Sequence, residues 1–280
     1  MKIKIQKKIS LLEALSEAFE DSSKRSLTQW IRQGRVLRRK AILDRSSEEL
    51  RPGDELNILP RTQTIDKDVR ILFQDSSLIV VEKPEGLLSV PKDKHPAPNV
   101  LEILRKHFRS RQIFAVHRLD RDASGLLVFA RGVKAKEALK GLFEKRKIQR
   151  EYIAIVEGGL KMESGTWKST LMEKENYDVS ATKNKAKGKL AITHFRRVKK
   201  SKSFSYLHIR LETGRKHQIR VHCKDANHPI LGDQRYESLT PSPRLFLHAH
   251  ELIFFHPLTK KKMYFLSPIP RSFVTFGYPA

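Results

Sequence analysis

The chain has 280 residues, enough for one sizeable core and a small additional domain, and no segment approaches the ~18 apolar residues of a membrane span. Lys and Arg number 56 against 31 Asp and Glu, and the net charge of +25 favours a polyanionic partner, nucleic acid above all. Cys223 alone cannot form an intrachain disulfide, and the N-terminus lacks the apolar core of a signal peptide. We therefore expect a cytoplasmic protein that binds nucleic acid and no membrane.

The first 33 residues predict two helices. Ser10 and Glu13 have the spacing of a capping box, and apolar residues follow at helical intervals. A second helix is expected over residues 23–33, ending at Gly34 in a left-handed cap. The residues that it is expected to bury are Leu27, Trp30 and Ile31.

Short strands are expected at residues 36–37 and 56–58, the latter after a Pro-Gly-Asp turn at 52–54. Five basic residues lie within nine positions around the helix end and the first strand: Arg32, Arg35, Arg38, Arg39 and Lys40. Because phosphate contacts supply most of the affinity for RNA, this cluster predicts an RNA-binding face. The alternative is a solvated basic loop on a structural domain. The polar residues 61–68 predict a linker.

The rest of the chain mixes strands and helices, which predicts an α+β domain with a mainly antiparallel sheet. Strands are expected at residues 71–73, 78–81, 126–130, 152–156, 203–211, 246–255 and 263–266. Helices are expected after Asn99, at residues 133–145 with Ala138, Leu142 and Phe143 inward, and at 217–226. Residues 181–203 hold nine Lys or Arg and no acid. They fit either a mobile solvated loop or an arm that grips RNA phosphates.

The most informative segment is HRLDRDASGLL at residues 117–127. It places Asp120 between two arginines, directly before an apolar run that reads as a buried strand. A carboxylate on a rigid element in a cationic pocket stays ionised and available for chemistry. The alternative is a surface ion pair of Asp120 with Arg118 or Arg121.

The order of motifs along the chain favours the chemical role. HRLD followed by SGLL resembles the catalytic signature of the RluA-type pseudouridine synthases. Four further segments resemble family motifs in family order: EKPEGL at 82–87, REYIA at 150–154, LETGRKHQIRVH at 211–222 and HPILGD at 228–233. The resemblance implies the fold of these enzymes over residues 69–280 and the isomerisation of uridine to pseudouridine in RNA.

The resemblance assigns the reacting carboxylate to Asp120, which acts either by attacking the sugar or by removing a ribose proton. It assigns Arg220 as the partner of Asp120, with phosphate binding as the alternative. Tyr152 is expected to stack on a flipped uracil, with a core tyrosine as the alternative. Further substrate-binding residues are expected to be His117, Arg118, Arg215, His217 and Ile219.

Residues 1–60 resemble the ribosomal S-four-type RNA-binding domain. The segments that carry this resemblance are SLTQWIRQGRV at 26–36 and RPGD at 51–54. The chain departs from that family in the hairpin, where Leu37-Arg38-Arg39-Lys40 stands in place of Val-Asn-Gly. The resemblance implies a docking domain for RNA.

No cofactor is expected, because the isomerisation exchanges no electrons and adds no group. No metal is expected either: His217, His222 and Cys223, or His248 and His250, lack the spacing of common zinc sites. RNA contacts or buried, hydrogen-bonded histidines are the preferred interpretation.

The favoured function is a monomeric synthase acting on structured ribosomal RNA, or alternatively transfer RNA. The rival is a catalytically silent RNA-binding or ribosome-assembly factor of the same fold, which would be expected to lose the aspartate. A glycosidase acting on free sugars fits less well, since it needs a second carboxylate and gives no reason for the positive charge.

Overall fold

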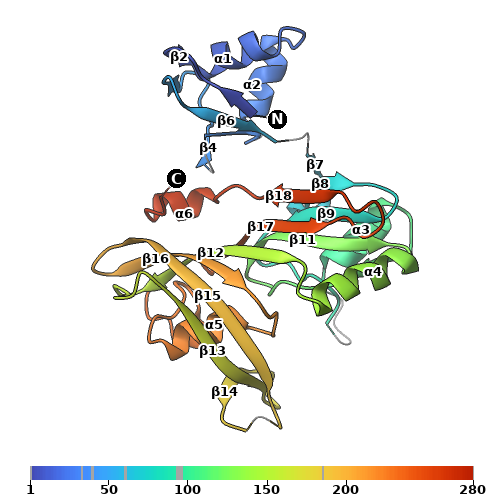
Figure 1. Cartoon of the computed structure of the whole chain (residues 1–280), viewed down its shortest axis with the longest axis vertical. Coiled ribbons are helices and arrows are strands. Elements are labelled where there is room, and N and C mark those ends of the chain that lie inside the picture. The colour runs from blue at the N-terminus through green and yellow to red at the C-terminus, as the bar shows by residue number, and fades with distance from the viewer. Residues whose placement is uncertain are drawn as a thin grey trace. The chain divides into compact units, whose positions relative to one another are not determined.

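A computed structural model describes residues 2–32, 34–38, 41–59, 62–92, 97–184 and 186–279. The chain forms two compact units (Figure 1): a smaller unit of residues 1–61 with 268–278, and a larger unit of residues 62–267. The C-terminal segment, expected in the second domain, thus groups with the first. It holds the short helix α6 (Arg271–Thr275), and Arg271 forms an ion pair with Asp44 of the same unit.

The smaller unit begins with the two predicted helices. Helix α1 (Leu11–Ala18) starts at a capping box in which Ser10 and Glu13 bond reciprocally. Helix α2 (Lys24–Arg32) is followed by Gly34 at a φ of 66°, the left-handed conformation that glycine adopts without steric cost. Both helix predictions are confirmed, although Trp30 is only partly buried.

Strands of the smaller unit cover these helices. The four-stranded sheet has the order β1 (Lys2–Lys4), β6 (Glu55–Ile58), β3 (Val36–Arg38) and β4 (Ala41–Ile42), and β2 (Ile9–Ser10) pairs with β5 (Glu49–Leu50). Leu11, Leu15, Leu27, Ile31 and Leu56 are fully buried between the helices and the sheet. The unit therefore has a core of its own.

The larger unit is built on one mixed sheet of twelve strands among the described residues. Its main path runs β14 (Val179–Thr182), β13 (Ser164–Glu173), β15 (Lys189–Lys200), β16 (Phe204–Leu211), β12 (Gln149–Glu157), β17 (Leu247–Phe255), β11 (Ser124–Arg131), β9 (Leu78–Lys83), β8 (Arg70–Gln74) and β7 (Gln63–Thr64). Strand β10 (Ile113–Ala115) pairs with β11, and β18 (Lys262–Leu266) pairs with β17. All pairs are antiparallel except β11 with β17, which confirms the α+β class and the mainly antiparallel sheet.

Helices lie against this sheet at two places (Figure 1). Helix α3 (Val100–His107), capped by Asn99 as predicted, packs beside β10, and α4 (Val133–Glu144) packs on β11. Helix α5 (Gln218–Asp225) packs on β13, β14 and β15. In α4 the buried residues are Ala135 and Leu139, so the prediction that Ala138 faces inward is wrong by one position.

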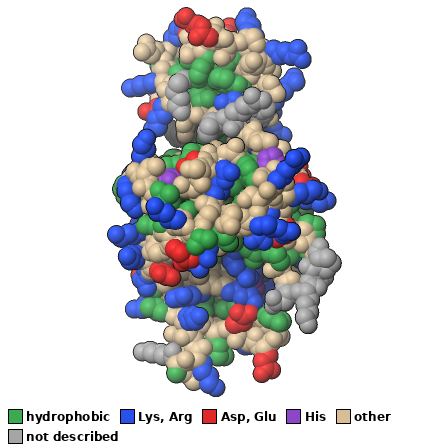
Figure 2. Space-filling view, turned by 90° about the vertical axis from the view of Figure 1, so that its right-hand side faces the viewer, with side chains coloured by type: hydrophobic (Ala, Val, Ile, Leu, Met, Phe, Trp, Pro, Cys, Tyr) green, Lys and Arg blue, Asp and Glu red, His purple; other side chains and the backbone are tan. Residues whose placement is uncertain are grey.

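Two predicted loops turn out to be strands. Within the expected linker 61–68, Gln63 and Thr64 form β7 at the sheet edge, and residues 66–68 form a short 3-10 helix. Most of the basic segment 181–203 belongs to β15, which pairs with β13 and β16, so the loop interpretation is wrong for that part. Lys185 lies outside the described residues. Figure 2 shows Lys and Arg side chains spread over the surface, as the net charge predicts.

Candidate active site

Asp120 lies in the loop between β10 and β11, and the strand that follows is buried along its apolar run, as the sequence predicted. The backbone is tethered on both sides of Asp120. The Ser89 hydroxyl donates to the carbonyl of Leu119 at 2.8 Å and accepts from its N–H at 3.0 Å. The Lys83 ammonium donates to the carbonyl of Arg121 at 2.8 Å. The carboxylate is therefore presented by a loop that packing and hydrogen bonds hold in place.

Lys83 is fully buried, although it carries an ionisable group. Its amino group also donates to the carbonyls of Pro84 and Leu87, at 2.7 and 2.8 Å. Burial lowers the pKa of Lys83 to about 7, and the nearby carboxylates of Asp122 and Asp120 oppose that shift. Three carbonyl acceptors match the three N–H donors of the ammonium form. The EKPEGL motif thus contributes a structural clamp on the Asp120 loop.

The position of Gly125 in the motif HRLDRDASGLL has a structural reason. Its φ is 112°, and an added Cβ would lie 2.2 Å from the carbonyl oxygen of Ala249. This close approach is where β11 pairs in parallel with β17, through Ser124 with His248 and Gly125 with Ala249. Only glycine fits, because both the conformation and the space exclude a side chain.

Arg220 joins two carboxylates from distant parts of the chain. It binds Asp233 through two bonds of 2.7 Å, and its Nη1 lies 3.3 Å from Oδ2 of Asp120. Arg220 and Asp233 are buried, whereas 18% of the Asp120 side chain is exposed. The two carboxylates raise the pKa of Arg220 against the effect of burial, which alone would lower it. The predicted Asp120–Arg220 pair is confirmed, and Asp233 fixes the guanidinium that holds it.

Tyr152 lies on β12 and faces the same space as Asp120. Burial raises the pKa of its phenol, with a smaller increase from Asp120 and an opposing effect of Arg150. The phenol is therefore protonated at neutral pH and can donate a hydrogen bond. Tyr152 is only 6% exposed and also lines the cleft, so part of the core-tyrosine alternative holds.

Arg150 is a cleft residue that the sequence interpretation did not single out. Burial lowers its pKa, and its Nε has no hydrogen-bond partner among the described residues. Its guanidinium lies 5.5 Å from the ring centre of Phe143. The signal was present in the REYIA motif: residues i and i+2 of a strand share a face, so Arg150 had to accompany Tyr152.

These side chains line one cleft of about 560 Å³. All of the predicted catalytic and substrate-binding residues contribute to it: His117, Arg118, Asp120, Tyr152, Arg215, His217, Ile219 and Arg220. Arg118 and Arg215 are exposed and basic, whereas Ile219 is buried and forms an apolar wall. The cleft thus combines the Asp120 carboxylate with several cationic side chains.

The two histidines of the cleft have partners within the protein. Nε2 of His117 accepts a bond of 3.0 Å from the N–H of Val128, and burial lowers the pKa of His117 to about 3. Nδ1 of His217 lies 2.7 Å from the Tyr236 hydroxyl, and burial lowers the pKa of His217 to about 4. Both rings are therefore neutral at pH 7. Nε2 of His217 lies 3.8 Å from Oδ1 of Asp120, so this histidine faces the carboxylate.

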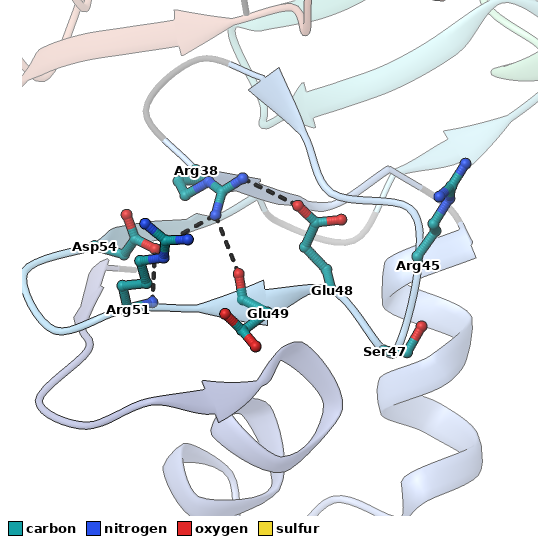
Figure 3. Close-up of a pocket in the computed structure, with 7 residues that line it drawn as sticks. All are labelled: Arg38, Arg45, Ser47, Glu48, Glu49, Arg51 and Asp54. Atoms are coloured by element: carbon teal, nitrogen blue, oxygen red, sulfur yellow. Dashed lines mark hydrogen bonds and ion pairs between the residues drawn. The ribbon is translucent and has the colours of Figure 1, made fainter.

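The arginines predicted to bind RNA in the smaller unit differ in their surroundings. Arg35 is buried, donates to the carbonyl of Leu59 and stacks 4.4 Å from the Trp30 ring centre, so the prediction of an RNA contact is wrong for it. Arg38 points into a pocket where it binds Glu48 at 3.0 Å and Asp54 at 3.4 Å (Figure 3). Arg32 is exposed, and Arg39 and Lys40 lie outside the described residues.

The site is a carboxylate held by a buried arginine in a cleft with several basic side chains, on a largely antiparallel α+β sheet, an arrangement suited to chemistry on an anionic substrate. A family model described as RNA pseudouridylate synthase matches residues 77–225, more than half of the chain. The chain belongs to this family of enzymes, as its five sequence motifs predicted.

Similar proteins agree with this assignment. "Ribosomal large subunit pseudouridine synthase D" of Haemophilus influenzae is 32% identical over 94% of this chain and 88% of its own length. "Uncharacterized RNA pseudouridine synthase YlyB" of Bacillus subtilis is 29% identical over 95% of this chain and 92% of its own. The solved structure of "Human RNA Pseudouridylate Synthase Domain Containing 4" has a TM-score of 0.60, covers 73% of this chain and 90% of its own, and is 23% identical, which shows a shared fold. No described helix is long and apolar enough to cross a membrane.

Proposed function

We propose that this enzyme converts specific uridines of ribosomal RNA to pseudouridine, with Asp120 as the reacting carboxylate. The observation that carries the proposal is the Asp120–Arg220–Asp233 arrangement, whose first two members line the cleft. Several relatives named for the large ribosomal subunit support ribosomal RNA as the substrate. The presence of Asp120, Tyr152 and Arg220 together argues against the silent RNA-binding alternative.

The reaction breaks the bond between N1 of uracil and the anomeric carbon, turns the base and forms a bond from carbon 5 to the same sugar carbon. The proton on carbon 5 is then lost and N1 gains a proton, so atoms balance without a co-reactant. Asp120 acts at the sugar, either as nucleophile at the anomeric carbon or as base toward a ribose proton. Arg220 contacts the carboxylate and orients it for either role.

Other residues of the cleft suit the uracil base. Tyr152 and Ile219 provide an aromatic and an apolar surface for a flipped uracil. The protonated phenol of Tyr152 can donate to a uracil carbonyl or relay the carbon 5 proton. Arg150, which lines the cleft with Tyr152, places a positive charge near the same base, where negative charge develops when N1 leaves.

Docking of the RNA involves the exposed cations. Arg118 and Arg215 line the cleft at its exposed part and can bind the phosphates that flank the target nucleotide. The smaller unit acts as an S-four-type RNA-binding domain, in which exposed Arg32 makes a phosphate contact. The enzyme acts as a monomer in the cytoplasm, where it meets a ribosomal substrate.

The proposal is tested with transcripts carrying tritium at carbon 5 of uridine, because pseudouridine formation releases that tritium. Transcripts of large-subunit ribosomal RNA, small-subunit ribosomal RNA and transfer RNAs are compared at equal uridine concentration. We expect release from the large-subunit RNA, at one or a few sites found by mapping pseudouridine in cells with and without the gene. Release from transfer RNA alone would contradict the ribosomal substrate, and no release from any RNA would contradict the enzymatic role.

A further inference from the structure

A cluster of histidine and glutamate lies on the larger unit and takes no part in the chemistry proposed above. The cluster consists of His208, His250 and Glu251. Each residue offers one ligand atom, a ring nitrogen or a carboxylate oxygen, and these atoms lie within 4.8 Å of one another. His250 and Glu251 are buried, and His208 is nearly so, with 15% of its side chain exposed. We propose that these three residues bind a zinc-type divalent cation.

Strand geometry places the cluster on the face of the sheet opposite Tyr152. Neighbouring residues of a strand point to opposite faces, so Glu151 points away from the cleft. His208 pairs with Ile153, two residues after Glu151, and therefore shares its face. The site and the active-site cleft thus lie on the two sides of β12.

A β-bulge brings His250 and Glu251 to the same place although they are neighbours in sequence. The register between β12 and β17 shifts there: Glu151 pairs with Glu251 and Tyr152 with Ala249, which leaves His250 as the extra residue. A regular strand would send adjacent side chains to opposite faces, and a bulge re-aims one of them. This irregularity is what lets one strand supply two ligands.

Hydrogen bonds orient both histidines as metal ligands. Nδ1 of His250 lies 2.6 Å from the carbonyl oxygen of Ser267, which can only accept, so this nitrogen carries the proton. Nδ1 of His208 lies 3.1 Å from a carboxylate oxygen of Glu151. Zinc-bound histidines typically donate their second N–H to a carbonyl or a carboxylate in this way, which leaves Nε2 for the metal.

A buried acceptor atom of His208 also points to a cation. Nε2 of His208 is buried and has no hydrogen-bond partner among the described residues. In Glu251, Oε2 accepts from the Tyr264 hydroxyl at 3.2 Å, and Oε1 lies 3.8 Å from Nε2 of His250. Two imidazole rings and a carboxylate thus meet at one point, and the Glu151 carboxylate contacts His208 from behind.

This donor set suits zinc better than magnesium or calcium, which prefer oxygen ligands. Tetrahedral zinc holds its ligands about 2.0–2.2 Å away, which separates them from one another by about 3.3 Å. The three side chains therefore rotate inward on binding, and a water completes the fourth position. Since the ligands come from β16 and β17, which flank β12, the ion would brace the strand that carries Tyr152.

The test uses the full chain, treated with a chelator and then titrated with zinc ion in competition with a chromophoric indicator. Cobalt ion serves as a spectroscopic probe, because its visible absorption reports the geometry of bound nitrogen and oxygen ligands. We expect about one ion per chain. His208→Ala and His250→Ala should each abolish this binding, whereas Glu151→Gln should weaken it about 10- to 100-fold as a change behind a ligand.

The matched control is His107→Ala, which removes an exposed histidine elsewhere in the same unit and should leave binding unchanged. Circular dichroism identifies any variant that fails to fold, and Glu251→Gln, which keeps the size of the side chain, provides a further variant in that case. No stoichiometric binding by the wild type would overturn the proposal. Equal binding by the wild type, His208→Ala and Glu251→Gln would overturn it as well.

Discussion

Two arginines, one in each unit, each contact two acidic side chains, and their surroundings differ. Arg220 in the larger unit is buried, binds Asp233 through two bonds of 2.7 Å and meets Asp120 at 3.3 Å. Arg38 in the smaller unit has 32% of its side chain exposed and meets Glu48 and Asp54 at 3.0 and 3.4 Å. The two arginines therefore have similar contact distances but differ strongly in their exposure to solvent.

This difference in burial decides how much each arginine contributes to the structure around it. A buried charge pair costs several kcal/mol when one partner is lost, because the other charge stays buried and unpaired. A pair near the surface is screened by water and contributes ~0–1 kcal/mol. Arg220 can thus hold Asp120 in a single orientation, whereas Arg38 can exchange its partners for solvent or phosphate.

The largest expected effect on stability comes from Arg220→Ala. The change leaves Asp233 buried without a partner, and we expect it to lower the free energy of unfolding by about 3–5 kcal/mol. Chemical denaturation measures this loss, with Arg38→Ala as the control. A loss below 1 kcal/mol would show that the two arginines are equivalent after all.

The second prediction concerns pH and the buried histidine His222. Burial lowers its pKa from 6.5 to about 4 in the folded chain, and Thr193 and Ser169 occupy its two nitrogens at 2.8 and 2.9 Å. Below pH 6.5 the unfolded state therefore takes up the proton first. The stability present above pH 6.5 should fall as the pH drops toward 4, by at most about 3 kcal/mol from this residue.

Unfolding curves from pH 7 to pH 4 test this prediction. The slope should be smaller in His222→Gln than in the wild type, because glutamine does not titrate. The exposed His107→Gln should keep the wild-type slope. Parallel curves for all three proteins would mean that folding does not lower the pKa of His222.

The third prediction distinguishes stacking from hydrogen bonding at Tyr152. Tyr152→Phe keeps the ring but loses the phenol, so we expect RNA binding to persist while turnover slows. Tyr152→Ala should also lose stacking, worth about 1–3 kcal/mol per base. Single-turnover rates and RNA affinities of both variants provide the measurement. Near-native rates in both would return Tyr152 to a purely structural role.

The smallest expected effects lie in the smaller unit. Arg38→Ala should change the free energy of unfolding by ~0–1 kcal/mol, since its partners remain solvated. Arg32→Ala should weaken RNA binding and reduce the slope of log affinity against log salt by about 0.7–0.9, the contribution of one phosphate. Binding at several salt concentrations tests this. An unchanged slope would exclude Arg32 as a phosphate contact.

The sequence predicted the pairing of Asp120 with Arg220 because family motifs mark both residues. It did not predict Asp233 as the anchor of Arg220, although HPILGD was recognised, since the contact forms only when α5 and the following turn pack together. The assignment of Arg35 to RNA was wrong because charge in a sequence does not reveal burial.

Local signals predicted local structure well. The capping box of Ser10, the cap at Gly34 and the strand after Gly125 all follow from side-chain chemistry within a few residues. The long strand β15 was missed because its lysines and arginines hide the alternation of a half-exposed strand, and only pairing with β13 and β16 fixes it. The bulge at His250 likewise depends on three strands and leaves no local signal.

The central claim is that Asp120, held by Arg220, is the carboxylate that reacts at the sugar. The most direct measurement is single-turnover tritium release by Asp120→Asn, compared with Asp122→Asn, whose carboxylate pairs with exposed Arg121 at 2.9 Å. Asparagine keeps the size of aspartate but can act neither as nucleophile nor as base. We expect Asp120→Asn to bind RNA normally and to lose at least about 10²–10⁴-fold in rate, while Asp122→Asn stays within a few-fold of the wild type. Turnover by Asp120→Asn within a few-fold of the wild type would contradict the account.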